Sequence, residues 1–223
     1  MKIQLFAILA IVALALASCG KSAPDSAKGS EAGKAATAAA AATTFTIDSE
    51  ASKLGWIGTK PTGQHNGSIK IASGTMNMEG ANLTAGEFTL DMNSITVLDL
   101  PREGDHSAVD LEGHLKSDDF FSVAANPTAT FVITSVEAVE GEGAITHNIN
   151  GNLTIKGITK QIAIPAAVSV AAGTFTADAN FSFDRTDFDI TYKSGNFFKE
   201  LGDKTINDEV KMELVLVAKA NAA

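Results

Sequence analysis

The chain has 223 residues, of which 45% are hydrophobic and 19% charged, and 26 Asp and Glu against 17 Lys and Arg give a net charge of −9. This length fits one domain of ordinary size preceded by a targeting segment. The acidic balance argues against a nucleic-acid-binding protein, which needs clustered Lys and Arg, and it offers no attraction to anionic lipid headgroups.

Residues 1–18 are typical of a secretory signal peptide. Lys2 precedes an unbroken apolar run over 5–17, which is shorter than the roughly 17–25 residues of a membrane-spanning helix and suits a cleaved signal. Residues 16–20 (LASCG) resemble the lipobox of bacterial lipoproteins. That resemblance implies cleavage directly before Cys19 and attachment of lipid to the Cys19 thiol.

Cys19 is the only cysteine of the chain, so an exported protein of this sequence cannot form an internal disulfide, and the thiol needs another role. Lipidation supplies one, because two or more acyl chains anchor a protein stably. The alternative is an ordinary signal peptide with a cysteine nearby by chance. Gly20 follows the cysteine, which resembles lipoproteins at the periplasmic side of the outer membrane. The inner membrane and surface display stay open.

Residues 19–43 are predicted to be a flexible tether. The segment consists mainly of Ala, Ser, Gly, Lys and Thr, with no aromatic and no large aliphatic residue, so it has little to bury in exchange for ordering. A flexible chain of this length has a root-mean-square reach of roughly 25–30 Å. We expect it to let the domain stand clear of the membrane surface.

Residues 44–220 are predicted to form an all-β domain, because hydrophobic residues recur with a period of two. Phe88, Leu90 and Met92 alternate with polar residues, for example, and such alternation is typical of half-buried strands. Glycine-containing turns separate the runs, which favours an antiparallel barrel or sandwich. Strands are expected near 44–48, 53–60, 65–79, 82–96, 128–140, 144–156, 159–171, 173–184 and 208–219.

One stretch, residues 101–121, breaks the alternation. Leu111 and Leu115 are four residues apart, with Val109 nearby, and this spacing predicts a short helix or two helical turns. Residues 196–201 (NFFKEL) are expected to form another single turn.

Four separated motifs resemble the YceI-like family. They are residues 113–121 (GHLKSDDFF) followed by 126–131 (NPTATF), residues 151–160 (GNLTIKGITK), residues 183–188 (FDRTDF), and residues 208–210 (DEV), which open the last strand. The resemblance implies a lipocalin-like antiparallel β-barrel of about eight strands with one or two short helices. It also implies a periplasmic protein that binds polyisoprenoid or other amphiphilic lipids. The glycine that the family carries after its "D-F" segment is Asp189 here.

The interior of such a barrel has room for side chains or for one small ligand. Alternation alone does not distinguish a hollow barrel from a filled one, and the hollow interpretation comes from the family. The residues expected to line a ligand cavity are Trp56, Phe88, Leu90, Met92, Phe131, Ile133, Phe175, Phe181, Phe183 and Met212. Two small residues among the phenylalanines, Ala177 and Ala179, are expected to leave room for the ligand.

Polar residues give no strong signal for catalysis, a cofactor or a metal. No two of the four histidines His65, His106, His114 and His147 are four residues apart, and no cysteine could join them as a zinc ligand. Asp118 and Asp119 are expected to cap a helical turn rather than to form an acid/base pair. Arg185 is expected to pair with Asp184 and Asp187 at a strand end, with a contact to a lipid headgroup as the alternative.

The sequence therefore predicts a membrane-anchored periplasmic lipoprotein that binds a polyisoprenoid or similar amphiphilic lipid, for carriage or storage, and that is not an enzyme. The alternative is a solid-cored envelope protein that docks a partner or responds to stress without a ligand. An enzyme acting on lipids would need convergent polar residues in a cleft. The oligomeric state is left open, a homodimer included.

Overall fold

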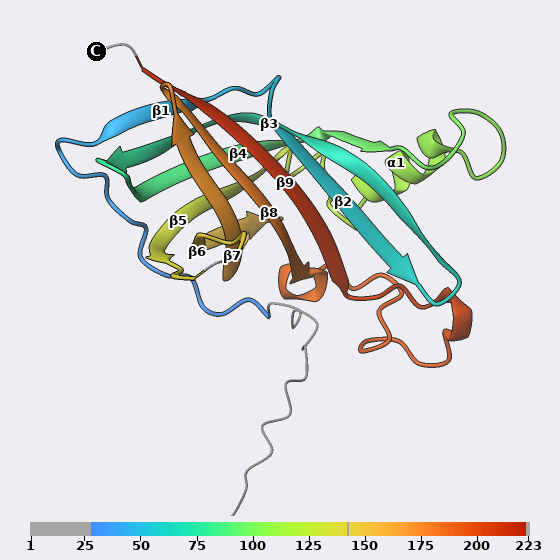
Figure 1. Ribbon diagram of the computed structural model, residues 1–223. Helices are drawn as coiled ribbons and strands as arrows, with labels where there is room; N and C mark the ends of the chain where they lie inside the picture. Colours follow the sequence, from blue (N-terminus) through green and yellow to red (C-terminus); the bar gives the residue numbers. More distant parts are fainter. Residues whose placement is uncertain (1–27, 142, 222–223) are drawn as a thin grey trace, which may run out of the picture.

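In the computed structural model, residues 28–141 and 143–221 are described, so the predicted signal peptide 1–18 and the lipid attachment at Cys19 lie outside the described residues. The described chain is mostly strand, with one α-helix and two short 3-10 helices (Figure 1). The elements are β1 (Thr43–Ile47), β2 (Lys53–Lys60), β3 (Gly63–Glu79), β4 (Asn82–Val97), α1 (Ala108–Lys116), β5 (Thr128–Ala138), β6 (His147–Ile155), β7 (Ile158–Ala171), β8 (Thr174–Asp184), η1 (Arg185–Phe188), η2 (Gly202–Lys204) and β9 (Glu209–Ala220).

The strands form a closed antiparallel barrel. Sheet order is β1-β3-β2-β9-β8-β7-β6-β5-β4, and pairing of β3 with β4 closes the ring. Both β1 and β2 lie between β3 and β9: Phe45 of β1 pairs with Ala220, whereas Trp56 of β2 pairs with Met212 further along β9. Nine strands therefore occupy eight positions. The predicted eight-stranded lipocalin-like barrel is confirmed, and each predicted strand ends within three residues of the observed one.

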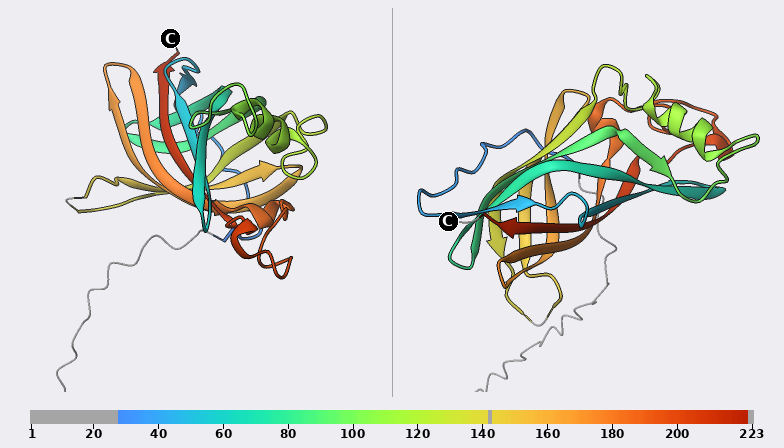
Figure 2. Two further views of the ribbon diagram at one scale, coloured as in Figure 1. Left: turned by 90° about the vertical axis from the view of Figure 1, so that its right-hand side faces the viewer. Right: turned by 90° about the horizontal axis from the view of Figure 1, so that it is seen from above.

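The two ends of the barrel differ. At one end, apolar side chains fill the interior, including Phe175, Ile133 and Leu216, each 2% exposed or less. At the other end the barrel is open, and α1 with its flanking loops and the segment 190–208 project beyond the strands (Figure 2). We call the first the closed end and the second the mouth.

The predicted helix over 101–121 is confirmed as α1, and its start is set by a capping box. Ser107 Oγ accepts a hydrogen bond from the Asp110 backbone N–H, and the Asp110 carboxylate accepts one from the Ser107 N–H. On the barrel-facing side, buried Glu112 accepts from the Val97 N–H and from Arg102. This clamp holds α1 against the end of β4. None of the helices in the described part of the chain is long and apolar enough to cross a membrane.

The single turn expected at 196–201 is present but begins two residues earlier. The N–H groups of Phe197 and Phe198 both donate to the Ser194 carbonyl, so the turn begins at Ser194, and η2 follows at Gly202–Lys204. A further 3-10 turn, η1, follows β8 directly and was not predicted.

Residues 28–42 correct the prediction of a free tether. They lie extended along the outside of β5, β6 and β7 (Figure 1), and we call them the strap. Ser30 exchanges two backbone hydrogen bonds with Gln161, and the Ala36 N–H donates to the Ile133 carbonyl. The Asn152 side chain both accepts from the Gly33 N–H (2.8 Å) and donates to the Gly33 carbonyl (2.7 Å).

Small residues make this close approach feasible. A Cβ atom on Gly33 would lie 2.5 Å from the Gln161 amide nitrogen, and one on Gly29 would lie 2.6 Å from Lys160 Cβ. At Gly29 the clash is with the first side-chain atom of Lys160, which cannot move without its backbone, so only glycine fits there. At Gly33 the clash is with the end of the Gln161 side chain, which would have to turn away and lose its hydrogen bond to Thr134. The composition that predicted a flexible chain thus also suits a flat segment held by hydrogen bonds.

Replacing Asn152 by alanine is expected to release the strap without unfolding the barrel. The substitution removes both hydrogen bonds to Gly33, each of which contributes about 0.5–1.5 kcal/mol. Hydrogen–deuterium exchange of the N–H groups of Ser30, Gly33 and Ala36 should rise at least tenfold, while exchange in β8 and β9 stays unchanged. Unchanged protection of the three strap amides would contradict this account of how the strap is held.

Candidate ligand-binding cavity

A cavity of about 440 Å³ opens at the mouth, within the range of roughly 300–1,000 Å³ usual for small-molecule sites. Its walls come from nearly every strand, from α1 and from the segment 190–208. Apolar side chains dominate the lining, including Leu54, Ile69, Ile95, Leu111, Leu115, Leu153, Ile155, Ile162, Ile164 and Ile190.

Eight of the ten side chains predicted to line a cavity do border it: Trp56, Phe88, Leu90, Met92, Phe131, Phe181, Phe183 and Met212. The other two, Ile133 and Phe175, do not. They surround a separate void of about 30 Å³ at the closed end, together with Ala177. The prediction that Ala177 and Ala179 leave room for a ligand is therefore wrong, because neither borders the cavity: Ala177 borders only the small void, and Ala179 borders neither space.

Phe88 and Phe131 form the floor of the cavity. Both border the cavity and the small void beyond it, and their rings stack with centroids 5.2 Å apart. Gly151 makes room for this arrangement, since a Cβ at that position would lie 2.2 Å from the Phe131 ring. Residue 151 stood out in the sequence only as the start of the motif 151–160, and nothing in the local pattern indicates that its lack of a side chain makes room for Phe131.

Trp56 is the single tryptophan of the chain and lies in the cavity wall. Its indole rests over Gly67, where an added Cβ would come within 2.5 Å of the six-membered ring. The indole Nε1 is buried and has no hydrogen-bond partner among the described residues. An unpaired buried donor is unusual, because it forgoes the hydrogen bond it had in water.

Polar residues gather at the mouth, and the charged ones among them are positive although the chain as a whole is negative. Lys60, Lys193 and Arg185 border the cavity, whereas none of the residues around it is an Asp or Glu. Three histidines, His65, His106 and His114, border it as well. A chain of net charge −9 thus presents two lysines and several hydrogen-bond donors at the mouth of its cavity, whereas Arg185 is buried.

Two of the histidines are oriented by carboxylates behind them. His65 Nδ1 lies 2.9 Å from Asp99, and His114 Nε2 lies 2.9 Å from Asp119. Burial by itself would raise the pKa of Asp99, but hydrogen bonds from the Asn66 N–H and from His65 lower it overall. No three His, Cys, Asp or Glu side chains in the described ranges cluster as a metal site would require.

The prediction that Asp118 and Asp119 cap a helical turn is wrong, because the residue that provides the cap is Ser117. Asp119 binds His114, and Ser117 ends α1 by donating from its hydroxyl to the His114 carbonyl. The His114 ring also meets the rings of Phe120 and Tyr192 edge-on, at 5.1 and 4.9 Å between centroids. This aromatic cluster joins α1 to the segment 190–208 across one side of the mouth.

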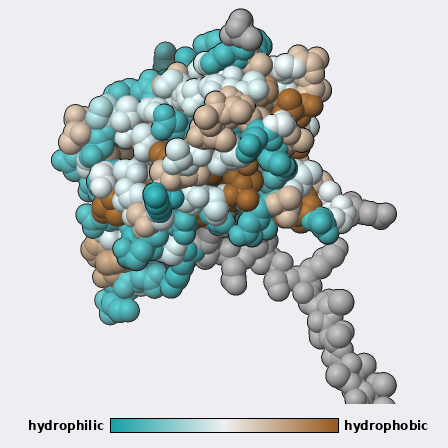
Figure 3. All heavy atoms as spheres, turned by 90° about the vertical axis from the view of Figure 1, so that its left-hand side faces the viewer, coloured by the Kyte–Doolittle hydropathy of each residue, from teal (hydrophilic) through white to brown (hydrophobic). Residues whose placement is uncertain are grey.

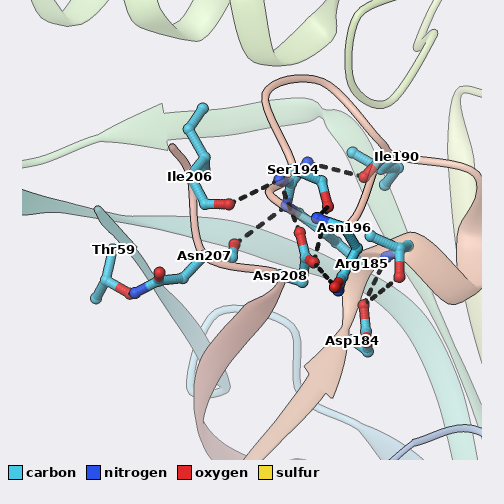
Figure 4. Close-up of polar contacts among 10 residues, drawn as sticks. Thr59, Asp184, Arg185, Ile190, Ser194, Asn196, Ile206, Asn207 and Asp208 are labelled. Atoms are coloured by element: carbon cyan, nitrogen blue, oxygen red, sulfur yellow. Dashed lines mark hydrogen bonds and ion pairs between the residues drawn. The ribbon is translucent and has the colours of Figure 1, made fainter. Parts of the chain in front are cut away.

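Arg185 is buried, with 3% of its surface exposed. The prediction that it pairs with Asp184 and Asp187 is wrong, because its partner is a different aspartate. Arg185 pairs with Asp208 at 3.0 Å, while Asp184 caps η1 through the Thr186 N–H (Figure 4). Asp187 instead accepts from the Gly29 N–H of the strap.

The guanidinium of Arg185 also donates to three backbone carbonyls, those of Ile190, Ile206 and Asn207. Burial lowers the pKa of Arg185, and the nearby Asp208 and Asp184 oppose that effect. With Asp208, these partners occupy four of its five N–H groups. The geometry therefore favours a role in holding the segment 190–208 over the alternative of a headgroup contact.

Asp189 replaces the family's expected glycine and adopts the left-handed conformation, with φ of 56°. It ends η1 by donating its backbone N–H to the Thr186 carbonyl. Glycine favours that region of backbone space, and aspartate tolerates it better than most residues do. The departure from the family pattern is therefore compatible with an unchanged backbone.

A hollow antiparallel barrel with an apolar interior, a closed end and a polar mouth defines a class of proteins that enclose one small ligand. Comparison with known families agrees: residues 45–218 match the YceI-like domain. The chain belongs to the YceI-like family.

Curated relatives match in part. A UPF0312 protein of Ectopseudomonas mendocina is 34% identical over 100 residues, which are 45% of this chain and 47% of the relative. One from Pseudomonas aeruginosa is 36% identical over 93 residues, 42% of this chain and 43% of the relative. The aligned region thus spans about half the length of the curated relatives that the chain matches.

Solved structures share the fold. Burkholderia cenocepacia BcnA superposes with a TM-score of 0.60 at 23% identity, over 78% of this chain and 99% of that one. A polyisoprenoid-binding domain from Saccharophagus degradans, implicated in plant cell wall breakdown, superposes with a TM-score of 0.56 at 15% identity, over 80% and 99% of the two chains.

Proposed function

We propose that this protein binds an amphiphilic lipid with a long apolar tail, of the polyisoprenoid class, with the tail inside the barrel and the polar head at the mouth. The observation that carries the proposal is the cavity of about 440 Å³, which is apolar, closed by Phe88 and Phe131, and open at one polar end. Burial of the tail contributes about 25 cal/mol per Å² of apolar surface, offset by ordering of the chain.

The mouth favours a head that is anionic or accepts hydrogen bonds. Lys60 and Lys193 border the cavity at this end, and no carboxylate borders it. A phosphate or carboxylate would gain charge-assisted hydrogen bonds there. The shared fold of the polyisoprenoid-binding domain from Saccharophagus degradans supports the tail assignment.

The cavity disfavours the alternative of a solid-cored envelope protein without a ligand, because empty apolar space forfeits packing contacts. Family membership supports binding rather than catalysis, since the YceI-like family is not known for an enzymatic activity. We further propose, from the lipobox and the signal sequence, that a lipid on Cys19 holds the protein at the periplasmic side of the outer membrane. Its role there would be carriage or storage of the bound lipid.

The single tryptophan makes the proposal directly testable. Titration with an isoprenyl phosphate and with the isoprenyl alcohol of equal length should each shift the Trp56 emission and saturate. Native mass spectrometry should show one ligand per chain, and the phosphate should bind about tenfold tighter or more. Unchanged emission with no bound mass for either lipid would reject the proposal, and equal affinity for both would reject the assignment of the head.

A further inference from the structure

The most exposed apolar side chains lie at the mouth. The four most exposed large hydrophobic residues among those described are Leu98 (67%), Phe197 (59%), Val109 (50%) and Phe198 (47%). Leu98 directly follows β4 and Val109 is on α1, whereas the two phenylalanines are in the segment 190–208. The two parts of the chain that carry them, α1 with its flanking loops and the segment 190–208, project on either side of the opening (Figure 2), and we call the four residues the rim.

The opposite face looks different. Figure 3 views the molecule from the closed end, where hydrophilic and intermediate residues cover most of the surface and hydrophobic ones form small separate groups. Isolated exposed hydrophobic residues are normal on a soluble surface, whereas a cluster around an opening marks a binding surface. We propose that the rim docks on the surface of a lipid bilayer and brings the mouth against the membrane.

The position of the strap is an independent observation that favours a bilayer as the partner. The Gly29 N–H donates to Asp187 at 2.7 Å, and Asp187 is in η1, at the end of β8 that surrounds the mouth. From there the strap runs to β1 at the closed end (Figure 1). The described chain therefore begins, at Lys28, at the mouth end of the barrel.

The length of the chain between Cys19 and Lys28 limits how far the mouth can lie from the anchor. Nine residue steps separate Cys19 from Lys28, which span at most about 30 Å when fully extended. A free tether of the predicted 25 residues would leave every face of the barrel equally able to meet the membrane. A docked strap instead keeps the mouth and its rim near the anchoring bilayer.

The nature of the surface also fits a bilayer. Two aromatic and two aliphatic side chains on separate projections can each insert between lipid headgroups without needing a matching rigid surface. The mouth that they surround opens into an apolar cavity, so a tail could pass between membrane and barrel without crossing water. This step rests on the proposed lipid ligand; docking of the rim does not.

The test uses the chain from residue 19 onward with Cys19→Ser, so that no acyl group contributes. Trp56→Phe first removes the natural tryptophan. A tryptophan reporter is then introduced at the rim by Phe197→Trp. The matched control carries Val170→Trp instead, at the closed-end tip of β7, where Val170 is 45% exposed. Vesicles contain equal parts of phosphatidylethanolamine and phosphatidylglycerol, with brominated acyl chains as quencher. We expect quenching and a blue shift for the rim reporter only.

Partitioning supplies the second measurement. The pair Phe197→Ser and Phe198→Ser should lower the vesicle partition coefficient at least about tenfold, because two phenylalanine rings no longer leave water. The control pair Val170→Ser and Val215→Ser should leave it unchanged. Equal quenching at both reporters, or vesicle binding that is absent or insensitive to the rim pair, would overturn the proposal.

Titration of the rim pair with isoprenyl phosphate in solution, read by Trp56 emission, separates this inference from the proposed function. Loss of docking with intact ligand affinity supports the rim as a membrane surface. If the unsubstituted chain docks through the rim but takes up no isoprenyl lipid, the proposed function fails and the rim proposal stands.

Discussion

Replacing Ala129 by phenylalanine is expected to abolish lipid binding while leaving the barrel folded. Ala129 is in β5, is 2% exposed and borders the cavity, so the added ring would occupy space that the ligand tail needs. Displacing about four methylene groups of tail costs about 3 kcal/mol, which is roughly a hundredfold in Kd. The Kd for an isoprenyl phosphate, measured by Trp56 emission, should rise by at least that factor.

The free energy of unfolding of the Ala129→Phe variant should change by less than about 1 kcal/mol, because the ring fills empty apolar space instead of displacing neighbours. Ala177 offers a matched control on β8. It is 5% exposed and borders only the void of about 30 Å³ at the closed end. Ala177→Phe should overpack the core and cost about 1–3 kcal/mol. Similar destabilisation by both substitutions would argue that the barrel is filled throughout.

Alternation predicted the strands well but could not locate the cavity along them. Phe131 and Ile133 are two residues apart on β5 and both point inward, yet Phe131 forms the cavity floor and Ile133 is in the closed-end core. Period-two patterning reports which face of a strand is buried. How far along the barrel axis the filling side chains extend depends on packing between strands that are distant in sequence.

Long-range polar contacts were the other part that the sequence did not predict. Arg185 was expected to pair with its neighbours in sequence, but it pairs with Asp208 at the start of β9. The strap was expected to be free, but Asn152 and Gln161, more than a hundred residues away, hold it. Composition and local spacing indicate how much apolar surface a segment can bury. They do not indicate which side chain of a distant strand will form a hydrogen bond or an ion pair with it.

Replacing Arg185 by methionine is expected to give the largest loss of stability, about 3–5 kcal/mol of unfolding free energy. The substitution leaves the Asp208 carboxylate without its cation and leaves the carbonyls of Ile190, Ile206 and Asn207 without a donor. Urea denaturation should show the loss as a lower midpoint. Arg185→Lys should recover only part of it, because an ammonium cannot reproduce the planar fork of donors.

Arg102→Met is the control, since Arg102 also pairs with a carboxylate but its side chain is 61% exposed. Its guanidinium is open to solvent, and buried Glu112 keeps its hydrogen bond from the Val97 N–H, so this variant should lose clearly less than Arg185→Met, about 1–2 kcal/mol. Asp208→Asn combined with Arg185→Met should cost less than the two single changes together, because each removes a partner of the other. If Arg185→Met cost no more than Arg102→Met, Arg185 would not be what holds the segment 190–208 to the barrel. A cavity-lining guanidinium with no structural role would then be the strongest candidate to bind the ligand's head.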